Sequence, residues 1–160
     1  YGCNAVYRDF EPDYLVSLDR NISQEIAENY DIENKPCYSI NINQKRYSEH
    51  FVLVPRNPTM NTGATATHIA RFDGHSKIYL LGFDSYNTDP KKINNVYVGT
   101  NAYAKEEEVY EYDLWTHQMV KLFTKYKDVQ FYRVGSKIID AYNNLDNVIH
   151  IKYDEFRSHL

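Results

Sequence analysis

The stretch Phe51–Leu81, FVLVPRNPTMNTGATATHIARFDGHSKIYLL, decides the fold. It opens with the apolar run Phe51–Val54, which predicts a strand buried on both faces. A loop rich in Pro, Asn and Thr then leads to a helix of small residues that starts at Gly63 and ends near Gly74. The stretch closes with Lys77–Leu81, a second run of strand-forming residues. A strand, a helix and a strand in this order predict a βαβ unit with parallel strands.

The rest of the chain continues this alternation of short apolar runs and helical patterns. The strongest helical pattern is Glu106–Tyr126, where apolar and aromatic residues recur three and four positions apart and an acidic start precedes a basic end. Further strands are predicted at Gly2–Tyr7, Tyr14–Leu18, Cys37–Ile42, Val129–Val134 and Val148–Ile151, and shorter helices at Ser23–Tyr30 (with Ser23 as its N-cap), Ser136–Ala141 and Tyr153–His159. The sequence therefore predicts a single α/β domain over residues 1–160, with a mostly parallel sheet and helices on both faces.

The composition excludes several classes of protein. Of the 160 residues, 42% are hydrophobic and 15% are aromatic, which is enough for a buried core and excludes a wholly disordered chain. The 18 basic and 22 acidic residues give a net charge of −4, which argues against nucleic acid and anionic membrane as partners. No apolar run approaches the roughly 20 residues that cross a bilayer. Cys3 and Cys37 form no CxxC pair, so we expect neither a disulfide framework nor a zinc ribbon, and a reducing, cytoplasmic location.

Polar residues follow several of the predicted strands, at the edge where parallel sheets bind their ligands. The most suggestive are Asn61, Thr62 and Gly63 at the start of a helix, where free N–H groups and the helix dipole favour an anion. Thr62 could donate a hydroxyl hydrogen bond, and Gly63 would let a phosphate approach the backbone. The alternative is that the small residues only let this helix pack closely on the sheet. The segment has neither a GxGxxG fingerprint nor a Walker motif, which disfavours NAD and P-loop nucleotide chemistry.

Two further residues, Asp84 and Tyr86, follow the strand Lys77–Leu81, where an enzyme would project functional groups. The alternative is that Asp84 caps a turn and Tyr86 packs half-exposed. The six histidines form no HxH, HxxxH or HExxH motif, and no DxD motif is present. The sequence therefore supports neither a local metal site nor a divalent-cation mechanism.

Three blocks, Gly2-Cys3-Asn4, Asn61-Thr62-Gly63-Ala64 and Lys77–Tyr86, together resemble the bacterial lipooligosaccharide sialyltransferases. More distantly, they resemble the archaeal hydroxymethylpterin diphosphokinase family. Short bacteriophage proteins carry the same run of motifs, and the chain is similar to these. The resemblance covers roughly Tyr1 to Arg133. It implies a Rossmann-like fold, a nucleotide-sugar donor such as a CMP-linked sugar, no metal, and for a viral protein the host cytoplasm.

The resemblance also nominates site residues. It implies that the donor nucleotide is bound by Asn4, Asn61, Thr62 and Gly63, with Tyr97 as the nearest candidate for a further tyrosine on the phosphate. It implies that Tyr86 donates to the leaving phosphate oxygen. The general base of the family is a histidine after a Tyr-x-Gly stretch, but here Tyr97-Val98-Gly99 is followed by Thr100, which cannot act as a base near neutral pH. Asp84 is the substitute base that the sequence offers.

The chain departs from the family at a second point, because it has no counterpart of the Gly-x-Gly-Pro-Ser turn that follows the first strand. The comparison thus implies a domain without its N-terminal strand and glycine-rich turn. Two hypotheses stay open: a metal-independent glycosyltransferase that uses a nucleotide-sugar, active or degenerate, and a non-catalytic binding or structural accessory protein of a virus. A third, diphosphoryl transfer to a pterin-like alcohol, would need magnesium-binding carboxylates that the sequence does not show.

Overall fold

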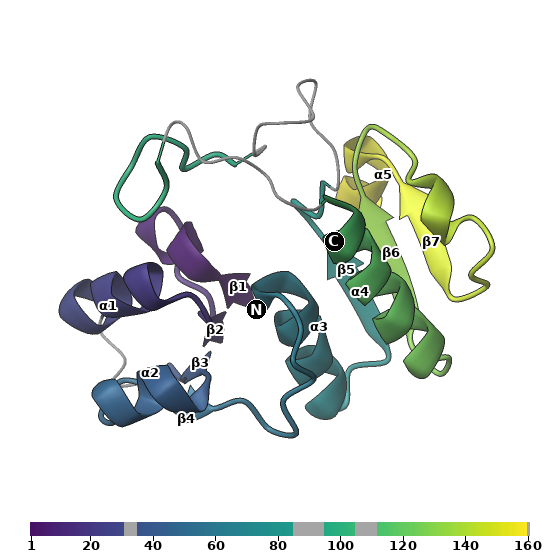
Figure 1. Ribbon diagram of the computed structural model, residues 1–160. Helices are drawn as coiled ribbons and strands as arrows, with labels where there is room; N and C mark the ends of the chain where they lie inside the picture. Colours follow the sequence, from purple (N-terminus) through teal and green to yellow (C-terminus); the bar gives the residue numbers. More distant parts are fainter. Residues whose placement is uncertain (31–34, 85–94, 105–111, 160) are drawn as a thin grey trace. The chain divides into compact units, whose positions relative to one another are not determined.

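The computed structural model describes residues 1–30, 35–84, 95–104 and 112–159. The chain divides into two compact units, the first made of Tyr1–Phe72 and Gly99–Lys105 and the second of Asp73–Val98 and Glu106–Leu160. Each unit contains a parallel sheet with helices on both faces (Figure 1). The predicted α/β class with a Rossmann-like, parallel arrangement is therefore confirmed.

The first unit has a sheet in the order β1-β2-β3-β4, in which all the strand pairs are parallel. Its strands are β1 (Gly2–Cys3), β2 (Leu15–Val16), β3 (Cys37–Ser39) and β4 (Val52–Leu53). The helices α1 (Arg20–Asn29) and α2 (Asn41–Arg46) lie on one face, and α3 (Thr62–Phe72) covers the other at β1 and β2 (Figure 1). A 3₁₀ helix, η1 (Asn4–Arg8), follows β1.

The small residues of α3 let it pack closely on this sheet. Ala66 and Ile69 of α3 form a buried cluster with Val16 of β2 and Val54 beside β4. A helix can approach a sheet this closely where its side chains are short, because the backbone is then the main contact surface. Close packing therefore accounts for part of the small-residue pattern of α3.

Three predicted boundaries in the first unit are wrong. The strand expected at Gly2–Tyr7 ends at Cys3, because Asn4 takes a left-handed φ of 51° and the chain turns into η1. α1 starts at Arg20, so Ser23 is a buried residue inside the helix and not its N-cap. The strand expected at Cys37–Ile42 stops at Ser39, and a six-residue helix follows it.

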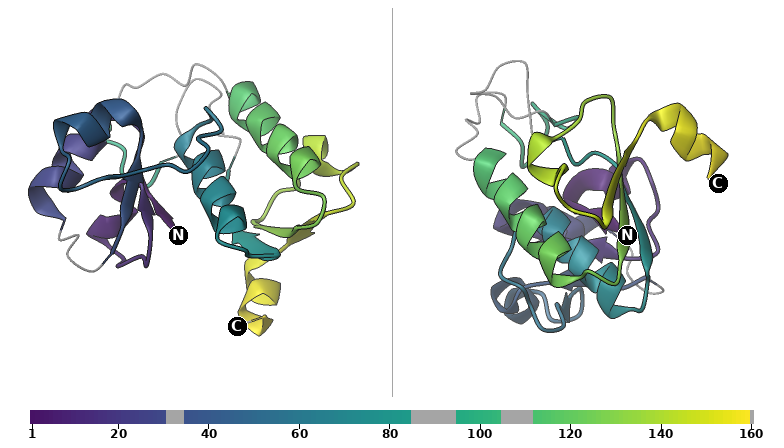
Figure 2. Two further views of the ribbon diagram at one scale, coloured as in Figure 1. Left: turned by 90° about the horizontal axis from the view of Figure 1, so that it is seen from below. Right: turned by 90° about the vertical axis from the view of Figure 1, so that its right-hand side faces the viewer.

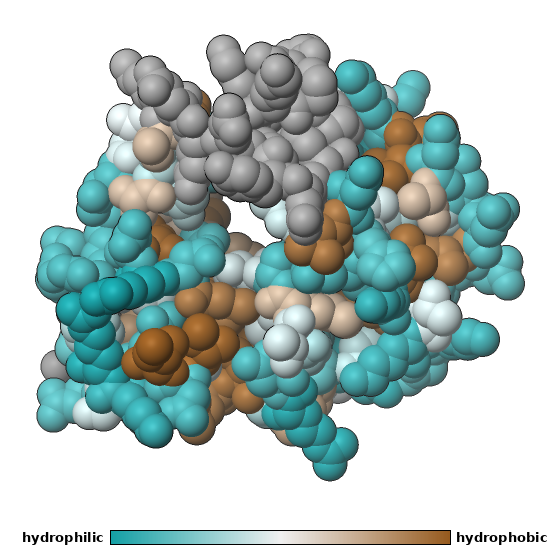
Figure 3. All heavy atoms as spheres, in the orientation of Figure 1, coloured by the Kyte–Doolittle hydropathy of each residue, from teal (hydrophilic) through white to brown (hydrophobic). Residues whose placement is uncertain are grey.

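The strand β4 also differs from its prediction, since it is not buried on both faces. Val52 and Leu53 are 51% and 48% exposed, whereas the flanking Phe51 and Val54 are buried. β4 is the edge strand of the described sheet, so it pairs with a neighbouring strand, β3, along one side only. Ile42 of α2 is also exposed, and a hydrophobic area is visible at the lower left of Figure 3, where Figure 1 places α2 and β4.

The second unit has the sheet order β5-β6-β7, again with parallel pairs. Its strands are β5 (Lys77–Leu80), β6 (Gln130–Val134) and β7 (Val148–Ile151), and its helices are α4 (Tyr112–Lys125) and α5 (Tyr153–Ser158). α4 and α5 lie on opposite faces of this sheet (Figure 2). The Phe123 ring of α4 packs 4.7 Å from the Phe131 ring of β6, and the Phe156 ring of α5 lies 5.3 Å from that of Tyr79 on β5.

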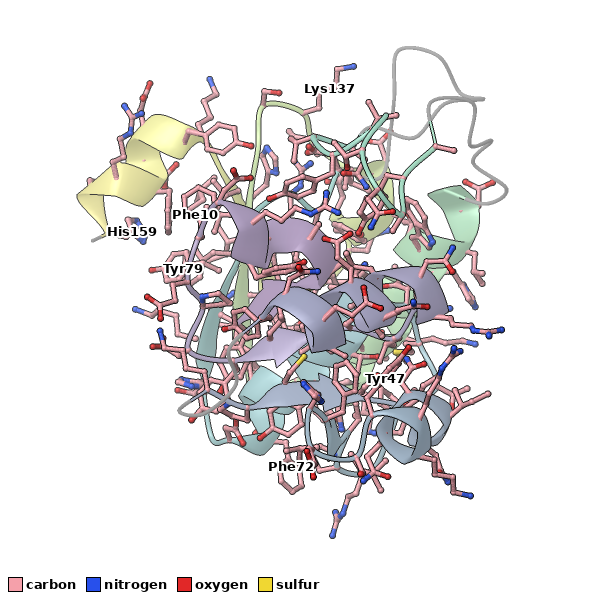
Figure 4. All side chains as sticks on the ribbon, turned by 90° about the vertical axis from the view of Figure 1, so that its left-hand side faces the viewer. Phe10, Tyr47, Phe72, Tyr79, Lys137 and His159 are labelled. Carbon is pink, nitrogen blue, oxygen red and sulfur yellow. The ribbon has the colours of Figure 1, made fainter. Side chains whose placement is uncertain are left out.

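Aromatic side chains attach α5 to its face of the second sheet. Tyr79 stacks on Tyr132 with the ring centroids 4.7 Å apart, and its hydroxyl lies 2.9 Å from Nδ1 of His159 (Figure 4). The predicted helix over Tyr153–His159 is thus confirmed apart from its last residue. The helix expected at Ser136–Ala141 is only the three-residue 3₁₀ turn η2 (Asp140–Tyr142). Among the described helices, none combines the length and the apolarity that a bilayer crossing needs.

Candidate functional site

Three polar side chains meet at the carboxyl ends of β1 and β2 in the first unit. The Asn4 amide nitrogen, directly after β1, donates to Oδ2 of Asp19 after β2 over 3.4 Å. The Tyr103 phenol is hydrogen-bonded to the Asn4 side chain and to the backbone N–H of Ala5. We call Asn4, Asp19 and Tyr103 the strand-end cluster. It lies at the edge where open parallel sheets bind their ligands.

The Asp19 carboxylate is not used by its own helix. Asp19 occupies the N-cap position of α1, yet its side chain makes no capping hydrogen bond. Desolvation by the surrounding protein raises the pKa of Asp19, and the hydrogen bond from Asn4 opposes this only in part. A carboxylate with a raised pKa binds a proton more readily, so Asp19 is suited to accept a proton or a hydroxyl hydrogen bond.

Burial also acts on Tyr103, whose pKa it raises to about 12 against the opposing hydrogen bonds from Ala5 and Asn4. Tyr103 therefore stays protonated at neutral pH and keeps a hydroxyl proton to donate. The cluster thus combines a carboxylate that accepts with a phenol that donates.

The side-chain carbonyl oxygen of Asn4, Oδ1, is a polar atom of this cluster for which the described residues supply no partner. Oδ1 is buried, and it has no hydrogen-bond partner among the described residues. A buried polar atom left in this state costs about 1–3 kcal/mol. A hydrogen-bond donor on a ligand would remove that cost, so the atom favours a ligand with an N–H or O–H group at this edge.

The start of α3 lies against the end of β1. The Cys3 thiol donates to the Thr62 carbonyl oxygen over 3.9 Å, which brings together the residue before Asn4 and the first residue of the helix. Asn61 is the cap of α3, because its Oδ1 accepts the backbone N–H of Ala64 at 2.9 Å. Thr62 is buried, and Gly63, one residue later, accepts the Thr67 hydroxyl at its carbonyl oxygen. The structure therefore places four of the five nominated nucleotide-binding residues in the first unit, namely Asn4, Asn61, Thr62 and Gly63.

Two further predicted residues, Tyr97 and Asp84, belong to the second unit. Tyr97 is half-buried, and its backbone N–H donates to Oδ1 of Asn95 at 2.9 Å. Asp84 follows β5 and accepts from Nη2 of Arg133 at 3.1 Å. Tyr86 lies outside the described residues.

Arg133 gives Asp84 a structural partner. Its side chain is 1% exposed, and its guanidinium also donates to the Lys137 carbonyl oxygen and lies beside His150. Burial and the Arg133 charge lower the pKa of His150. A buried arginine requires an anionic neighbour, and Asp84 supplies it.

Sequence reasoning did not nominate Asp19 or Tyr103 as site residues. The sequence signal for Asp19 was its place directly after the predicted strand Tyr14–Leu18. Tyr103 carries no local signal, since the chain brings it to the cluster from far along the sequence. Within the described parts of the chain, no three His, Cys, Asp or Glu side chains form a group that could hold a metal ion.

Comparisons of the chain with protein-family models, with curated proteins and with solved structures find no match. The geometry of the strand-end cluster is therefore the basis of the functional conclusion.

Proposed function

We propose that the first unit binds a nucleotide at the carboxyl edge of its sheet, and that this nucleotide is the leaving half of a nucleotide-sugar. The strand-end cluster beside the start of α3 is the observation that carries the proposal. It supplies an unpartnered amide oxygen, a carboxylate with a raised pKa and a phenol at one sheet edge. The resemblance to glycosyltransferases that use nucleotide-sugars supports the same class of ligand.

The parts of the site then have separate roles. The first turn of α3 and the Gly63 backbone hold the donor phosphate, which the helix dipole favours. Asn4 orients the nucleoside through its amide. Asp19 takes the proton of an acceptor hydroxyl, whose oxygen attacks the anomeric carbon of the sugar. The bond from that carbon to the phosphate oxygen breaks, and the nucleoside phosphate leaves with a hydrogen bond from Tyr103.

This assignment makes Asp19 the base in place of Asp84. Asp84 already forms an ion pair with the buried Arg133, so its carboxylate is part of a structural contact. Proton acceptance is favoured instead at Asp19, where desolvation disfavours the charge. No divalent ion is required in this scheme, because the helix dipole and the phenol stabilise the leaving phosphate.

One observation favours the second candidate, a non-catalytic nucleotide-binding protein. Thr100 follows the Tyr97-Val98-Gly99 stretch, where the resemblance to the sialyltransferases would place a histidine base, and it accepts a hydrogen bond from Nη1 of Arg8 at 2.7 Å. The residue is thus part of a structural contact. If Asp19 does not act as the base, the chain retains a site for the nucleotide without the chemistry.

The binding proposal is tested by titrating the protein with CMP, CDP, UDP and GDP, with and without magnesium. A nucleotide at a hundred times its Kd adds about 2.7 kcal/mol to the free energy of unfolding, which raises the Tm by several degrees. In Asn4→Gly the backbone keeps its left-handed conformation and the amide is lost, so we expect at least a tenfold weaker affinity with little change in the Tm of the free protein. The control is Gln44→Ala, a half-buried residue of α2 that lies outside the strand-end cluster.

The outcomes separate the two candidates. The site is supported if one nucleotide binds the unmodified protein, binds Asn4→Gly more weakly, and binds Gln44→Ala with unchanged affinity. Donor hydrolysis that disappears in Asp19→Asn, while binding remains, supports the transferase. Binding without hydrolysis in the unmodified protein supports the non-catalytic candidate. No binding of any nucleotide, or equal affinity in Asn4→Gly, overturns the proposed site.

A further inference from the structure

Tyr103 reaches the strand-end cluster from a short turn that we call the strap, residues 99–104. The Gly99 N–H donates to the Tyr103 carbonyl oxygen at 2.7 Å, and the Tyr103 N–H donates to the Thr100 carbonyl oxygen at 3.1 Å. Gly99 and Ala102 both have a positive φ, of 81° and 64°. The strap is therefore a tight turn with a defined shape, and the place where it is anchored decides where Tyr103 lies.

Arg8 at the end of η1 is the anchor of the strap. Its Nη1 donates to Oγ1 of Thr100 at 2.7 Å, and its Nη2 donates to the Asn101 carbonyl oxygen at 2.9 Å. These two bonds join parts of the chain more than 90 residues apart in sequence. Arg8 thus holds the strap by hydrogen bonds to two consecutive residues, Thr100 and Asn101, and Tyr103 of the same strap is directed to Asn4.

Glu25 of α1 in turn holds Arg8. Nε and Nη2 of Arg8 donate to the two carboxylate oxygens of Glu25 at 2.7 and 2.6 Å. Glu25 also accepts the Tyr7 hydroxyl at 2.6 Å and the Asn101 amide, and it is only 8% exposed. Burial alone would raise the pKa of Glu25, but these hydrogen bonds and the Arg8 charge lower it. Glu25 therefore stays ionised and keeps the guanidinium in one orientation.

We infer that Arg8 is a positioning residue of the proposed nucleotide site, which holds the strap so that Tyr103 stays beside Asn4 and Asp19. This inference rests on the proposed function, because it concerns the affinity of that site. Arg8 acts through the strap and not on the ligand. Only arginine suits the position, since its planar fork binds Glu25 with two N–H groups and still has N–H groups for the strap, whereas an ammonium cannot make this set.

The first test is the variant Arg8→Lys, probed with whichever of CMP, CDP, UDP and GDP binds the unmodified protein. Loss of the two bonds to the strap should weaken affinity on the order of tenfold. Hydrogen exchange of residues 99–104 should become faster in the same variant. The matched control is Lys35→Gln, which removes an ion pair to Glu11 in the same unit and should change neither quantity.

A double-mutant cycle separates positioning from a general loss of structure. If Arg8 acts through Tyr103, the combined variant Arg8→Lys/Tyr103→Phe should bind no more weakly than the weaker of the two single variants. If the fold-losses of affinity in the two single variants multiply in the combined variant, Arg8 acts elsewhere and the inference is overturned. Thr100→Val, which removes one acceptor of Arg8 at an exposed residue, gives a milder second test with an expected loss of a few-fold.

The failure of the inference can be told from the failure of the proposed function. If Asn4→Gly weakens nucleotide binding at least tenfold, but Arg8→Lys and Thr100→Val change neither the affinity nor the exchange of the strap, the inference alone is overturned. Absence of nucleotide binding in the unmodified protein overturns both.

Discussion

Asn4 stands where β1 ends and η1 begins, with a φ of 51° that few residues other than glycine adopt. Asparagine tolerates this conformation better than other residues with a Cβ, because its short amide makes local hydrogen bonds. The same amide bonds to Asp19 and Tyr103 and keeps a buried oxygen without a described partner. One residue thus ends a strand and shapes the proposed site.

Two substitutions separate these roles of Asn4. Asn4→Ala should lower the free energy of unfolding by about 1 kcal/mol more than Asn4→Gly, because alanine in the left-handed region is strained and glycine is not. Urea denaturation of both variants measures the difference. Equal stability of the two would mean that the backbone at Asn4 is not held in the left-handed region.

At the scale of elements, α2 shows how tertiary contacts fix a helix that is too short to form alone. A six-residue helix is not stable by itself in water. The Asn43 amide of α2 donates to the Leu18 carbonyl oxygen at 2.9 Å and lies 3.0 Å from the hydroxyls of Ser23 and Ser39. Because Asn43 and both serines are buried, this network connects α2 to α1 and to the ends of β2 and β3.

Loss of the Asn43 amide should therefore be costly. We expect Asn43→Ala to lower the free energy of unfolding by about 2–4 kcal/mol, because it opens a small cavity and leaves buried acceptors unpaired. The exposed residue Lys45 of the same helix, changed to alanine, should have an effect within about 0.5 kcal/mol. Chemical denaturation of both variants tests this, and similar effects would contradict the role assigned to the network.

The sequence predicts the type and the bounds of some helices and strands more accurately than those of others. α3 and β5 were predicted within a residue or two, since a run of helix-compatible small residues and a run of β-formers each carry a local signal. η1 was expected to be strand, because the decisive left-handed φ of Asn4 is not visible in the apolar pattern around it. α2 was not predicted, and its first two residues, Asn41 and Ile42, were expected to continue a strand. The network of Asn43 that holds this helix consists of contacts distant in sequence.

At the scale of the whole molecule, the proposed site depends on contacts between distant parts of the chain. Asn61, Thr62 and Gly63 could be nominated from the sequence because they start a helix. Tyr103 could not, since its place depends on bonds from Arg8 to the strap, more than 90 residues further along the chain. Hydrophobic periodicity and local propensity depend on neighbouring residues, so they do not predict contacts between residues far apart in sequence.

The Arg8–Glu25 pair makes the stability of the chain depend on pH. The pKa of Glu25 is lower in the folded state than its usual value of 4.5. The stabilisation is therefore fully present above about pH 4.5 and is lost as the pH falls through the lowered folded value. The difference in unfolding free energy between the unmodified protein and Glu25→Gln should shrink between pH 5 and pH 3. Urea denaturation across this range measures it, and a constant difference would contradict the assigned ion pair.

The measurement that tests the central claim most directly is hydrogen–deuterium exchange of the unmodified protein with and without each of the four nucleotides. We predict that one nucleotide slows exchange in residues 2–8, 17–20, 61–65 and 99–104, the segments that form the strand-end cluster, the start of α3 and the strap. Protection confined to the segments of β5, β6 and β7, or no protection with any of the four nucleotides, would contradict it.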